Sequence, residues 1–435
     1  MERFALSRMK EWKENENRKP LIIRGARQVG KTWIMKTFGQ QYFEKTAYVN
    51  FDNNARMKQV FEGDLDIERL VLSISAETGV SIEAENTLII FDEVQEVPKA
   101  LTSLKYFYEN APQYAIVAAE SLLGVALHQG TSFPVGKVDF LDLYPLHFRE
   151  FLCAMGEKQF VSMLDSCDTQ MVTVFKTKYI ERLREYYFVG GMPEVVKDFS
   201  EKKDYNRVRA IQKNLINYYQ QDFSKHAEIK LVPRLNLVWN SIPMQLAKEN
   251  KKYIYGQVRE GSRAKDFELA IQWLLDCGLI HKVQRIQKPD LPLKAYIDFD
   301  AFKLFLVDIG LLIAMTDLDA KVIIEGNKIF TEFKGALTEQ YILQQLISDV
   351  GVIPYYYSTQ NSKGEIDFLV QGKTSVIPIE VKAEENLKAK SLKAFCEKYQ
   401  PSYAVRTSMS DYREQDWMTN IPLYAVKWIK NYVNQ

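Results

Sequence analysis

The sequence predicts an α/β protein with an N-terminal parallel sheet, a mostly helical middle region and a separate C-terminal α/β domain. Three observations support this. Short apolar segments alternate with helix-like stretches at the start of the chain, apolar residues then recur at helical spacing, and strand-like segments return beyond Lys294. At 435 residues the chain is too long for one ordinary core, so roughly two or three domains are expected.

The composition is that of a folded protein, with 46% hydrophobic and 26% charged residues. Lysine plus arginine (57) nearly balances aspartate plus glutamate (56), so binding to nucleic acid would require local basic patches. The N-terminus lacks the apolar core and cleavage site of a secretory signal, which predicts a cytoplasmic protein. The apolar stretch 302–315 contains Lys303 and Asp308 and is shorter than the roughly 20 residues that span a bilayer, so no membrane partner is expected.

The four cysteines are widely spaced and form no CxxC pair, and the four histidines are scattered. Neither a zinc site nor a disulfide framework is therefore indicated, and the cysteines are interpreted as buried or incidental thiols.

The first expected domain covers residues 1–145. Its apolar segments predict strands, and a helix is expected to begin at Lys31. The predicted strands are Leu21–Arg24, Ala47–Phe51, Thr87–Phe91 and Tyr114–Ala119. Short apolar strands separated by helical crossovers are typical of a parallel sheet covered on both faces.

The middle of the chain divides into two expected regions. Residues 146–230 are predicted to be helical, with a break at the Gly190-Gly191-Met192-Pro193 segment. Residues 231–293 form the second region, in which Leu235–Ile286 is predicted to be helical with a turn at Gly261-Ser262. The end of that stretch, WLLDCGLIHKVQRI, weakly resembles a recognition helix followed by a wing, which suggests a winged-helix-like module.

The last expected domain covers residues 294–435. Its predicted strands lie around Phe302–Asp308, Pro354–Ser358, Glu365–Val370 and Ser375–Val381, with a helix near Gly335–Asp349. This pattern predicts a second α/β domain.

The segment from Gly25 to Thr32 fits the pattern G-x-x-x-x-G-K-[ST], directly after a predicted strand and at the start of a helix. Glycines let the backbone approach phosphate oxygens, and the helix N-terminus directs amide donors towards them. Lys31 is expected to reach the β- and γ-phosphates, and Thr32 to place its hydroxyl on Mg²⁺. The expected ATP-binding residues are Gly25, Gln28, Gly30, Lys31 and Thr32.

A second motif follows in TLIIFDE, where four apolar residues lead into Asp92 and Glu93 at the end of a predicted strand. Asp92 is expected to hold Mg²⁺ and Glu93 to polarise the attacking water. A strand that merely ends in exposed acids is the alternative for this motif taken alone. Together with the phosphate-binding loop, it predicts an ATP hydrolase in which Lys31 and Glu93 are catalytic.

A polar residue at the end of a further strand often senses the γ-phosphate. Ser121 is the candidate, since it follows the strand Tyr114–Ala119. Glu120 is unfavourable there, because a carboxylate would repel a triphosphate, so it either points away or weakens the sensor. An arginine from another subunit often completes such a site, and Arg149, Arg182 and Arg184 are candidates among which the sequence does not choose.

The C-terminal domain carries a group of acids and a lysine on two predicted strands. Strand alternation places Glu380 and Lys382 on one side, where Asp367 of the neighbouring strand can face them. Glu339 on the preceding helix could add a further carboxylate. Asp367, Glu380 and Glu339 are the expected ligands of Mg²⁺ or Mn²⁺, and Glu380 and Lys382 are the expected catalytic residues for phosphodiester cleavage. A hairpin with a charged edge is the alternative.

The motifs together resemble a bacterial and archaeal family of AAA-type ATPases fused to a C-terminal domain of unknown function with a PD-(D/E)xK, restriction-endonuclease-like fold. The resemblance extends over nearly the whole chain and is carried by GARQVGKT, LIIFDEVQ, SLLGVAL, YPLHFREFL, FVGGMPEVV, YYQQDFSK, FKLFLVDIGLL, KGALTEQYI, GEIDFLV and IPIEVK. It implies a P-loop NTPase sheet and a winged-helix-like module between the two ends. One departure is Glu120, where the family usually has glycine, and it puts normal phosphate sensing in doubt.

Two functions are compatible with these residues. The first is an Mg-ATP-dependent ATPase that couples its nucleotide state to binding or cleavage of DNA or RNA. Local basic stretches such as Lys251-Lys252 are compatible with it, although a solvated helix face is the favoured interpretation of these lysines. The second is a nucleotide-dependent switch or scaffold that binds a protein partner and has no nuclease activity. An oligomer is compatible with either function.

Overall fold

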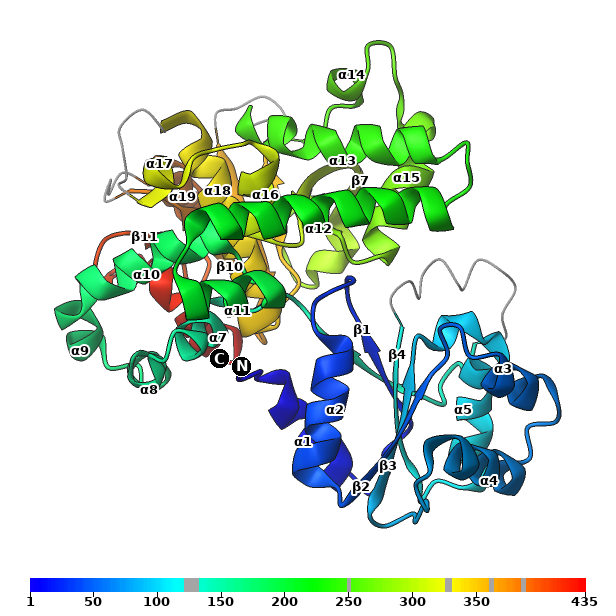
Figure 1. Cartoon of the computed structure of the whole chain (residues 1–435). Helices are drawn as coiled ribbons and strands as arrows, with labels where there is room; N and C mark the ends of the chain where they lie inside the picture. Colours follow the sequence, from blue (N-terminus) through cyan, green and yellow to red (C-terminus); the bar gives the residue numbers. More distant parts are fainter. Residues whose placement is uncertain (121–132, 249–251, 325–330, 360–363, 385–388) are drawn as a thin grey trace. The chain divides into compact units, whose positions relative to one another are not determined.

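The computed structural model describes residues 1–120, 133–248, 252–324, 331–359, 364–384 and 389–435 (Figure 1). The chain divides into two compact units, which are described separately. The N-terminal unit comprises Glu2–Tyr144 and the short segment Asp276–Leu279. The C-terminal unit comprises Pro145–Leu275 and Ile280–Gln435, together with Met1.

The N-terminal unit alternates strands and helices along the chain. Its elements are α1 (Ala5–Glu14), β1 (Leu21–Arg24), α2 (Lys31–Tyr42), β2 (Lys45–Asn50), α3 (Ala55–Glu62), α4 (Ile67–Thr78), β3 (Thr87–Asp92), the 3₁₀ turn η1 (Val94–Glu96), α5 (Pro98–Asn110), β4 (Ala115–Ala119) and β5 (Asp139–Asp142).

The five strands form one parallel sheet in the order β2-β3-β4-β1-β5. Figure 1 shows α1 and α2 on one side of this sheet and α3, α4 and α5 on the other. The described side chains of β3 and β4 are all buried, as expected for strands covered on both faces. The prediction of a parallel α/β sheet is therefore confirmed. The edge strand β5 was not predicted, because its four residues, DFLD, carry too little apolar signal.

The strand order fixes which chain segments meet at the carboxyl edge of the sheet. Strand β4 lies between β1 and β3, with Ile22 paired to Ala118 and Phe91 also paired to Ala118. The segments that follow β1, β4 and β3 therefore emerge side by side at this edge.

The C-terminal unit begins with helices and ends with a mixed sheet. Its first elements are α7 (Phe148–Ala154), α8 (Lys158–Asp165), α9 (Thr169–Val174), α10 (Lys176–Val189), α11 (Pro193–Lys202), α12 (Tyr205–His226), α13 (Val232–Ala247), α14 (Tyr255–Val258) and α15 (Ala264–Asp276). The following ones are β6 (Ile280–Ile286), η2 (Leu293–Tyr296), β7 (Ile297–Leu306), α16 (Ile309–Met315), α17 (Ala320–Ile324), α18 (Thr331–Gln345) and the π-helical turn η4 (Leu346–Val350). The last are β8 (Tyr355–Ser358), β9 (Glu365–Gln371), β10 (Val376–Val381), α19 (Lys390–Tyr399), β11 (Val405–Ser408), β12 (Arg413–Gln415), β13 (Met418–Pro422), η5 (Leu423–Trp428) and α20 (Ile429–Val433).

Eight strands of this unit form a single sheet in the order β12-β13-β11-β10-β9-β8-β6-β7. The antiparallel pair β6–β7 joins it through parallel pairing of β6 with β8. The expected helical stretch to Ile286 is wrong at its end, because Ile280–Ile286 forms β6. The alternation of buried and more exposed residues in IHKVQRI fits a strand with one covered face.

The glycine pair that interrupts the helical region makes a close backbone contact with a buried aspartate. Asp308 accepts hydrogen bonds from the Gly191 amide (2.6 Å) and, as the N-cap of α16, from the Leu311 amide (3.1 Å). Gly190 has a φ of 73°, and a Cβ there would lie 2.2 Å from Asp308 Oδ1. Glycine is therefore required at this position.

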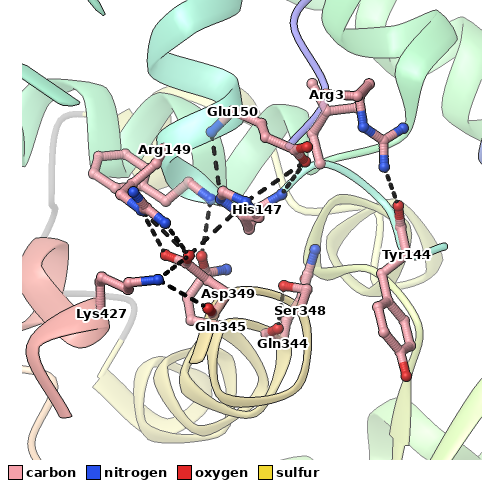
Figure 2. Close-up of polar contacts among 12 residues, drawn as sticks. Arg3, Tyr144, His147, Arg149, Glu150, Gln344, Gln345, Ser348, Asp349 and Lys427 are labelled. Atoms are coloured by element: carbon pink, nitrogen blue, oxygen red, sulfur yellow. Dashed lines mark hydrogen bonds and ion pairs between the residues drawn. The ribbon is translucent and has the colours of Figure 1, made fainter. Parts of the chain in front are cut away.

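A second buried acid joins the first helices of the unit to its end (Figure 2). Arg149 Nε donates to Asp349 Oδ2 (3.0 Å), Lys427 Nζ lies 3.6 Å from Asp349 Oδ1, and His147 Nε2 lies 3.9 Å from the same oxygen. Burial raises the pKa of Asp349, but the charges of His147, Arg149 and Lys427 hold it well below its ordinary value. Asp349 is therefore an ionised structural centre.

Within the described part of the chain, no helix combines the length and apolar character needed to cross a membrane.

Candidate functional site: the phosphate-binding loop and a carboxylate cluster

The segment 25–30 forms the turn between β1 and α2, as the sequence pattern predicts. Gly30 caps α2 in the left-handed region with a φ of 94°, and Gln28 also has a positive φ of 65°. A Cβ on Gly25 would lie 2.1 Å from the Leu143 carbonyl oxygen, so only glycine fits there. The loop thus leads directly into the N-terminus of α2, where free amide groups favour an anion.

Lys31 is the first residue of α2 and is only 6% exposed. Its Nζ donates to the carbonyl oxygens of Gly25 (2.7 Å) and Ala26 (2.8 Å). Burial lowers the pKa of Lys31 to about 8, although the charges of Glu93 and Asp92 act in the opposite direction. A buried ammonium within a phosphate-binding loop is well placed to bind phosphate oxygens.

Asp92 and Glu93 stand at the carboxyl end of β3. Asp92 is buried, and its Oδ2 accepts a hydrogen bond from the Tyr48 hydroxyl (2.9 Å). Glu93 has a φ of 53°, an uncommon value for a non-glycine residue, at the bend where β3 gives way to η1. The Thr32 hydroxyl and the Asp92 carboxylate are oxygen donors of the kind that Mg²⁺ prefers, so this donor set fits the metal.

Glu120 directly follows β4, between the segments that end β1 and β3. The side chain is 1% exposed, and among the described residues neither carboxylate oxygen has a hydrogen-bond partner. Burial and the charge of Glu93 raise the pKa of Glu120 to about 8, while Lys31 acts to lower it. The expected sensor Ser121 lies outside the described residues.

Sequence reasoning missed Arg3, a buried residue that supports the loop. Its Nη1 donates to the Val29 carbonyl (3.0 Å) and its Nη2 to the Tyr144 carbonyl (2.6 Å). Arg3 thereby ties the phosphate-binding loop to the segment after β5. Nothing in the local sequence around Arg3 signals this role.

The three candidate trans-acting arginines all have partners within the C-terminal unit. Arg149 binds Asp349 and also contacts Asp165. Arg182 forms an ion pair with Glu157 (2.8 Å), and Arg184 donates a hydrogen bond to the Ile324 carbonyl (3.3 Å).

In the C-terminal unit, the acids of the GEIDFLV and IPIEVK segments lie on adjacent strands. Strands β9 and β10 are antiparallel, with Ile379 opposite Phe368, and Asp367 Oδ2 accepts from the Val381 amide (2.7 Å). Lys382 Nζ lies 2.7 Å from Glu380 Oε1. Burial and the charges of nearby Glu339 and Glu380 raise the pKa of Asp367 well above its ordinary value.

A lysine that sequence reasoning did not consider lies among these acids. Lys303 Nζ lies 2.7 Å from Glu365 Oε1 and 3.3 Å from Glu339 Oε2, and its side chain is 10% exposed. Burial lowers the pKa of Lys303, but Glu339, Glu365 and Asp367 together raise it above the ordinary value. We call the six residues Lys303, Glu339, Glu365, Asp367, Glu380 and Lys382 the carboxylate cluster.

The carboxylate cluster contains oxygen donors of the type that binds divalent metals, but these donors are not arranged to hold a metal ion. Across the described ranges, no group of three or more His, Cys, Asp or Glu residues is placed to hold a metal ion. Lys303 and Lys382 already form ion pairs with Glu339, Glu365 and Glu380. We therefore derive no chemical step through a metal at this cluster.

Three segments of the chain match known families. Residues 17–152 match the AAA domain family, residues 180–322 match a domain of unknown function (DUF8612), and residues 334–426 match another domain of unknown function (DUF4143). The first match, together with the loop and the Asp92–Glu93 pair, supports an AAA-type ATPase domain of the P-loop class in the N-terminal unit. A search of the curated proteins gave no match.

Several solved structures resemble the chain at low similarity. A Walker-type ATPase of Pyrococcus abyssi is 15% identical, with 72% of this chain and 95% of that one covered and a TM-score of 0.43. The Orc1 protein of Aeropyrum pernix, solved in complex with DNA, is 12% identical, with 72% and 91% covered and a TM-score of 0.27. RuvB of Thermotoga maritima is 10% identical, with 64% and 87% covered and a TM-score of 0.29. At these TM-scores the likenesses carry no argument about function.

Proposed function

We propose that the N-terminal unit binds Mg-ATP and hydrolyses it. The observation that carries this proposal is Lys31, buried at the start of α2 and subject to the charges of Asp92 and Glu93. A phosphate-binding cation and two acids at one sheet edge are the groups that phosphoryl transfer to water requires.

Each residue has a distinct role in this proposal. The amides of the loop from Gly25 to Gly30 and the Lys31 ammonium bind the phosphates, with Gln28 lining the loop. Glu93 accepts the proton of the attacking water. Thr32 and Asp92 would hold Mg²⁺, which neutralises phosphate charge when bound.

The proposal extends to the C-terminal unit, where the nucleotide state is coupled to binding or cleavage of DNA or RNA. What supports this extension is the composition of the carboxylate cluster, in which Glu339 of α18, Asp367 of β9, Glu380 of β10 and the adjacent Lys382 lie together. The helices α13 to α15 followed by the β6–β7 pair are compatible with a winged-helix-like module for binding.

A second candidate is a nucleotide-dependent switch or scaffold that binds a protein partner and cleaves nothing. The ion pairs of Lys303 and Lys382 favour it, because they give Glu339, Glu365 and Glu380 counter-ions without a metal. The two candidates share the ATP site and differ only in the chemistry of the carboxylate cluster.

The ATP site is tested by binding and hydrolysis of ATP in wild type, Lys31→Ala and Glu93→Gln, with the exposed Lys58→Ala as control. Lys31→Ala should weaken ATP binding by at least tenfold, and Glu93→Gln should retain binding while hydrolysis falls by about 100-fold or more. Equal hydrolysis by wild type and both variants would refute the proposal.

The extension to nucleic acid is tested by cleavage of varied DNA and RNA with Mg²⁺ or Mn²⁺, with and without ATP. Cleavage that is lost in Asp367→Ala and retained in the exposed control Glu397→Ala would establish a nuclease. The response of cleavage to Lys31→Ala would then show whether ATP controls it. No cleavage of any substrate would favour the switch.

A further inference from the structure

The position of Glu120 is the least expected feature of the ATP site. Glu120 follows the strand between β1 and β3, at the sheet edge where the terminal phosphate of a bound nucleotide is expected. If ionised, this acid would repel the phosphate. The structure instead buries it to 1% exposure and leaves both its oxygens without a hydrogen-bond partner among the described residues.

We propose that Glu120 is a neutral acid in the resting protein and donates its carboxyl hydrogen to an oxygen of the terminal phosphate of bound ATP. This inference rests on the proposed function, because it concerns the same site. It makes Glu120 a residue that distinguishes ATP from ADP, since only ATP carries the phosphate that accepts this hydrogen bond.

The burial of Glu120 favours its protonated form. A buried carboxylate without partners is costly, whereas a protonated carboxyl group needs only one acceptor for its hydrogen. The pKa of Glu120 is raised to about 8, first by burial and then by Glu93. At neutral pH the group is therefore mostly protonated.

The charged groups around Glu120 agree with this assignment. Lys31 of α2 and Glu93 after β3 act on it with opposite signs. On the neighbouring strand β1, Arg24 is already paired to Asp142 (2.8 Å). The phosphates of bound ATP would add negative charge, which raises the pKa of Glu120 further.

The inference is tested by equilibrium binding of ATP and ADP, each with Mg²⁺, to wild type, Glu120→Gln and Glu120→Ala between pH 7 and pH 9.5. Glutamine retains a hydrogen-bond donor but does not titrate, whereas alanine has no donor. The exposed Glu85→Gln is the matched control on the same unit. Circular dichroism verifies that each variant is folded.

At pH 7, Glu120→Ala should lose about tenfold in ATP affinity and little in ADP affinity, since a hydrogen bond to a charged group is worth that much. Glu120→Gln should stay within about threefold of wild type. Between pH 7 and pH 9.5 the ATP affinity of wild type should fall by about tenfold, while that of Glu120→Gln falls less. Lys31 also loses its proton in this pH range. The decrease in ATP affinity that Glu120→Gln still shows therefore measures the contribution of Lys31.

Two results would overturn the inference while leaving the nucleotide site intact. In the first, Glu120→Gln binds ATP as weakly as Glu120→Ala; in the second, wild type and Glu120→Gln show the same pH dependence. Binding is measured without turnover, so the inference is tested even if the protein hydrolyses no ATP. If Lys31→Ala binds ATP as well as wild type does, the nucleotide site itself is refuted, and the inference with it.

Discussion

The phosphate-binding loop and the carboxylate cluster both bring lysines close to acids, yet they neutralise charge in different ways. At the ATP site, Lys31 donates to two backbone carbonyls, and Glu120 after β4 has no hydrogen-bond partner among the described residues. In the cluster, Lys303 and Lys382 lie within 2.7–3.3 Å of glutamate oxygens. A buried acid without a counter-ion or hydrogen-bond partner gains most from a ligand, whereas the glutamates of the cluster already have lysine counter-ions.

The largest expected effect comes from removing the buried cation of the cluster. Lys303→Met would leave the partly buried Glu339 and Glu365 without their counter-ion, and breaking a fully buried pair costs about 3–5 kcal/mol, so the cost here should approach but not exceed that value. The free energy of unfolding of the C-terminal unit should fall by an amount of this order, as measured by denaturant titration or calorimetry. The exposed Lys373→Met is the matched control and should change little.

A second substitution shows whether the loss arises from uncompensated charge. Adding Glu365→Gln to Lys303→Met removes one of the orphaned carboxylates and should restore part of the stability. If Lys303→Met unfolds no more readily than Lys373→Met, the cluster is not held together by its ion pairs, and the contrast with the loop fails. Tight Mn²⁺ binding by wild type that is lost in Asp367→Asn would also refute this contrast, because the cluster would then be a metal site.

The next effect is a pH dependence of stability caused by Glu120 at the ATP site. Glu120 has a pKa of about 8 in the folded chain against 4.5 for the ordinary group, so between these values the folded protein holds a proton that the unfolded chain has released. Stability due to this group is therefore fully present below about pH 4.5 and is lost as the pH rises towards 8. Glu120→Gln abolishes this dependence.

The measurement is the melting temperature of wild type and Glu120→Gln without nucleotide, from pH 5.5 to pH 8.5. Between pH 5.5 and pH 8 the advantage of the glutamine variant should grow by roughly 3 kcal/mol, each pKa unit being worth about 1.4 kcal/mol. The exposed Glu85→Gln should follow wild type throughout. An advantage of Glu120→Gln that does not grow with pH would show that Glu120 is ionised in the folded protein.

The sequence was a good guide wherever local pattern determines the structure. The strand Leu21–Arg24 and the start of α2 at Lys31 lie where they were predicted, because a short apolar run followed by glycines leaves few alternatives. Strands β9 and β10 were located from their short runs of apolar residues. Strand β5 could not be found, since its pairing with β1 is what makes DFLD a strand.

The parts of the sites that sequence did not reveal depend on long-range contacts. Arg3 reaches Val29 and Tyr144, and Lys303 reaches Glu339 and Glu365, across separations that no local pattern encodes. The sequence drew attention to Glu120, but only as a carboxylate that would repel the triphosphate. Only burial, which depends on the packed sheet, shows that this carboxyl group favours its neutral form.

The smallest expected effect concerns the Asp92 carboxylate, which unlike Glu120 has a partner. Tyr48 donates to Asp92 Oδ2 (2.9 Å), and burial together with the charge of Asp92 raises the pKa of Tyr48 well above its ordinary value, so the hydroxyl keeps its proton. Tyr48→Phe removes this hydrogen bond and should cost about 1 kcal/mol of stability.

If Asp92 holds Mg²⁺ as proposed, Tyr48→Phe should also raise the Mg²⁺ concentration for half-maximal ATP hydrolysis by up to about tenfold, because the carboxylate is no longer fixed in orientation. Tyr42→Phe on α2 is the control, and an equal Mg²⁺ requirement in both variants would mean that Asp92 does not need Tyr48 to bind the metal.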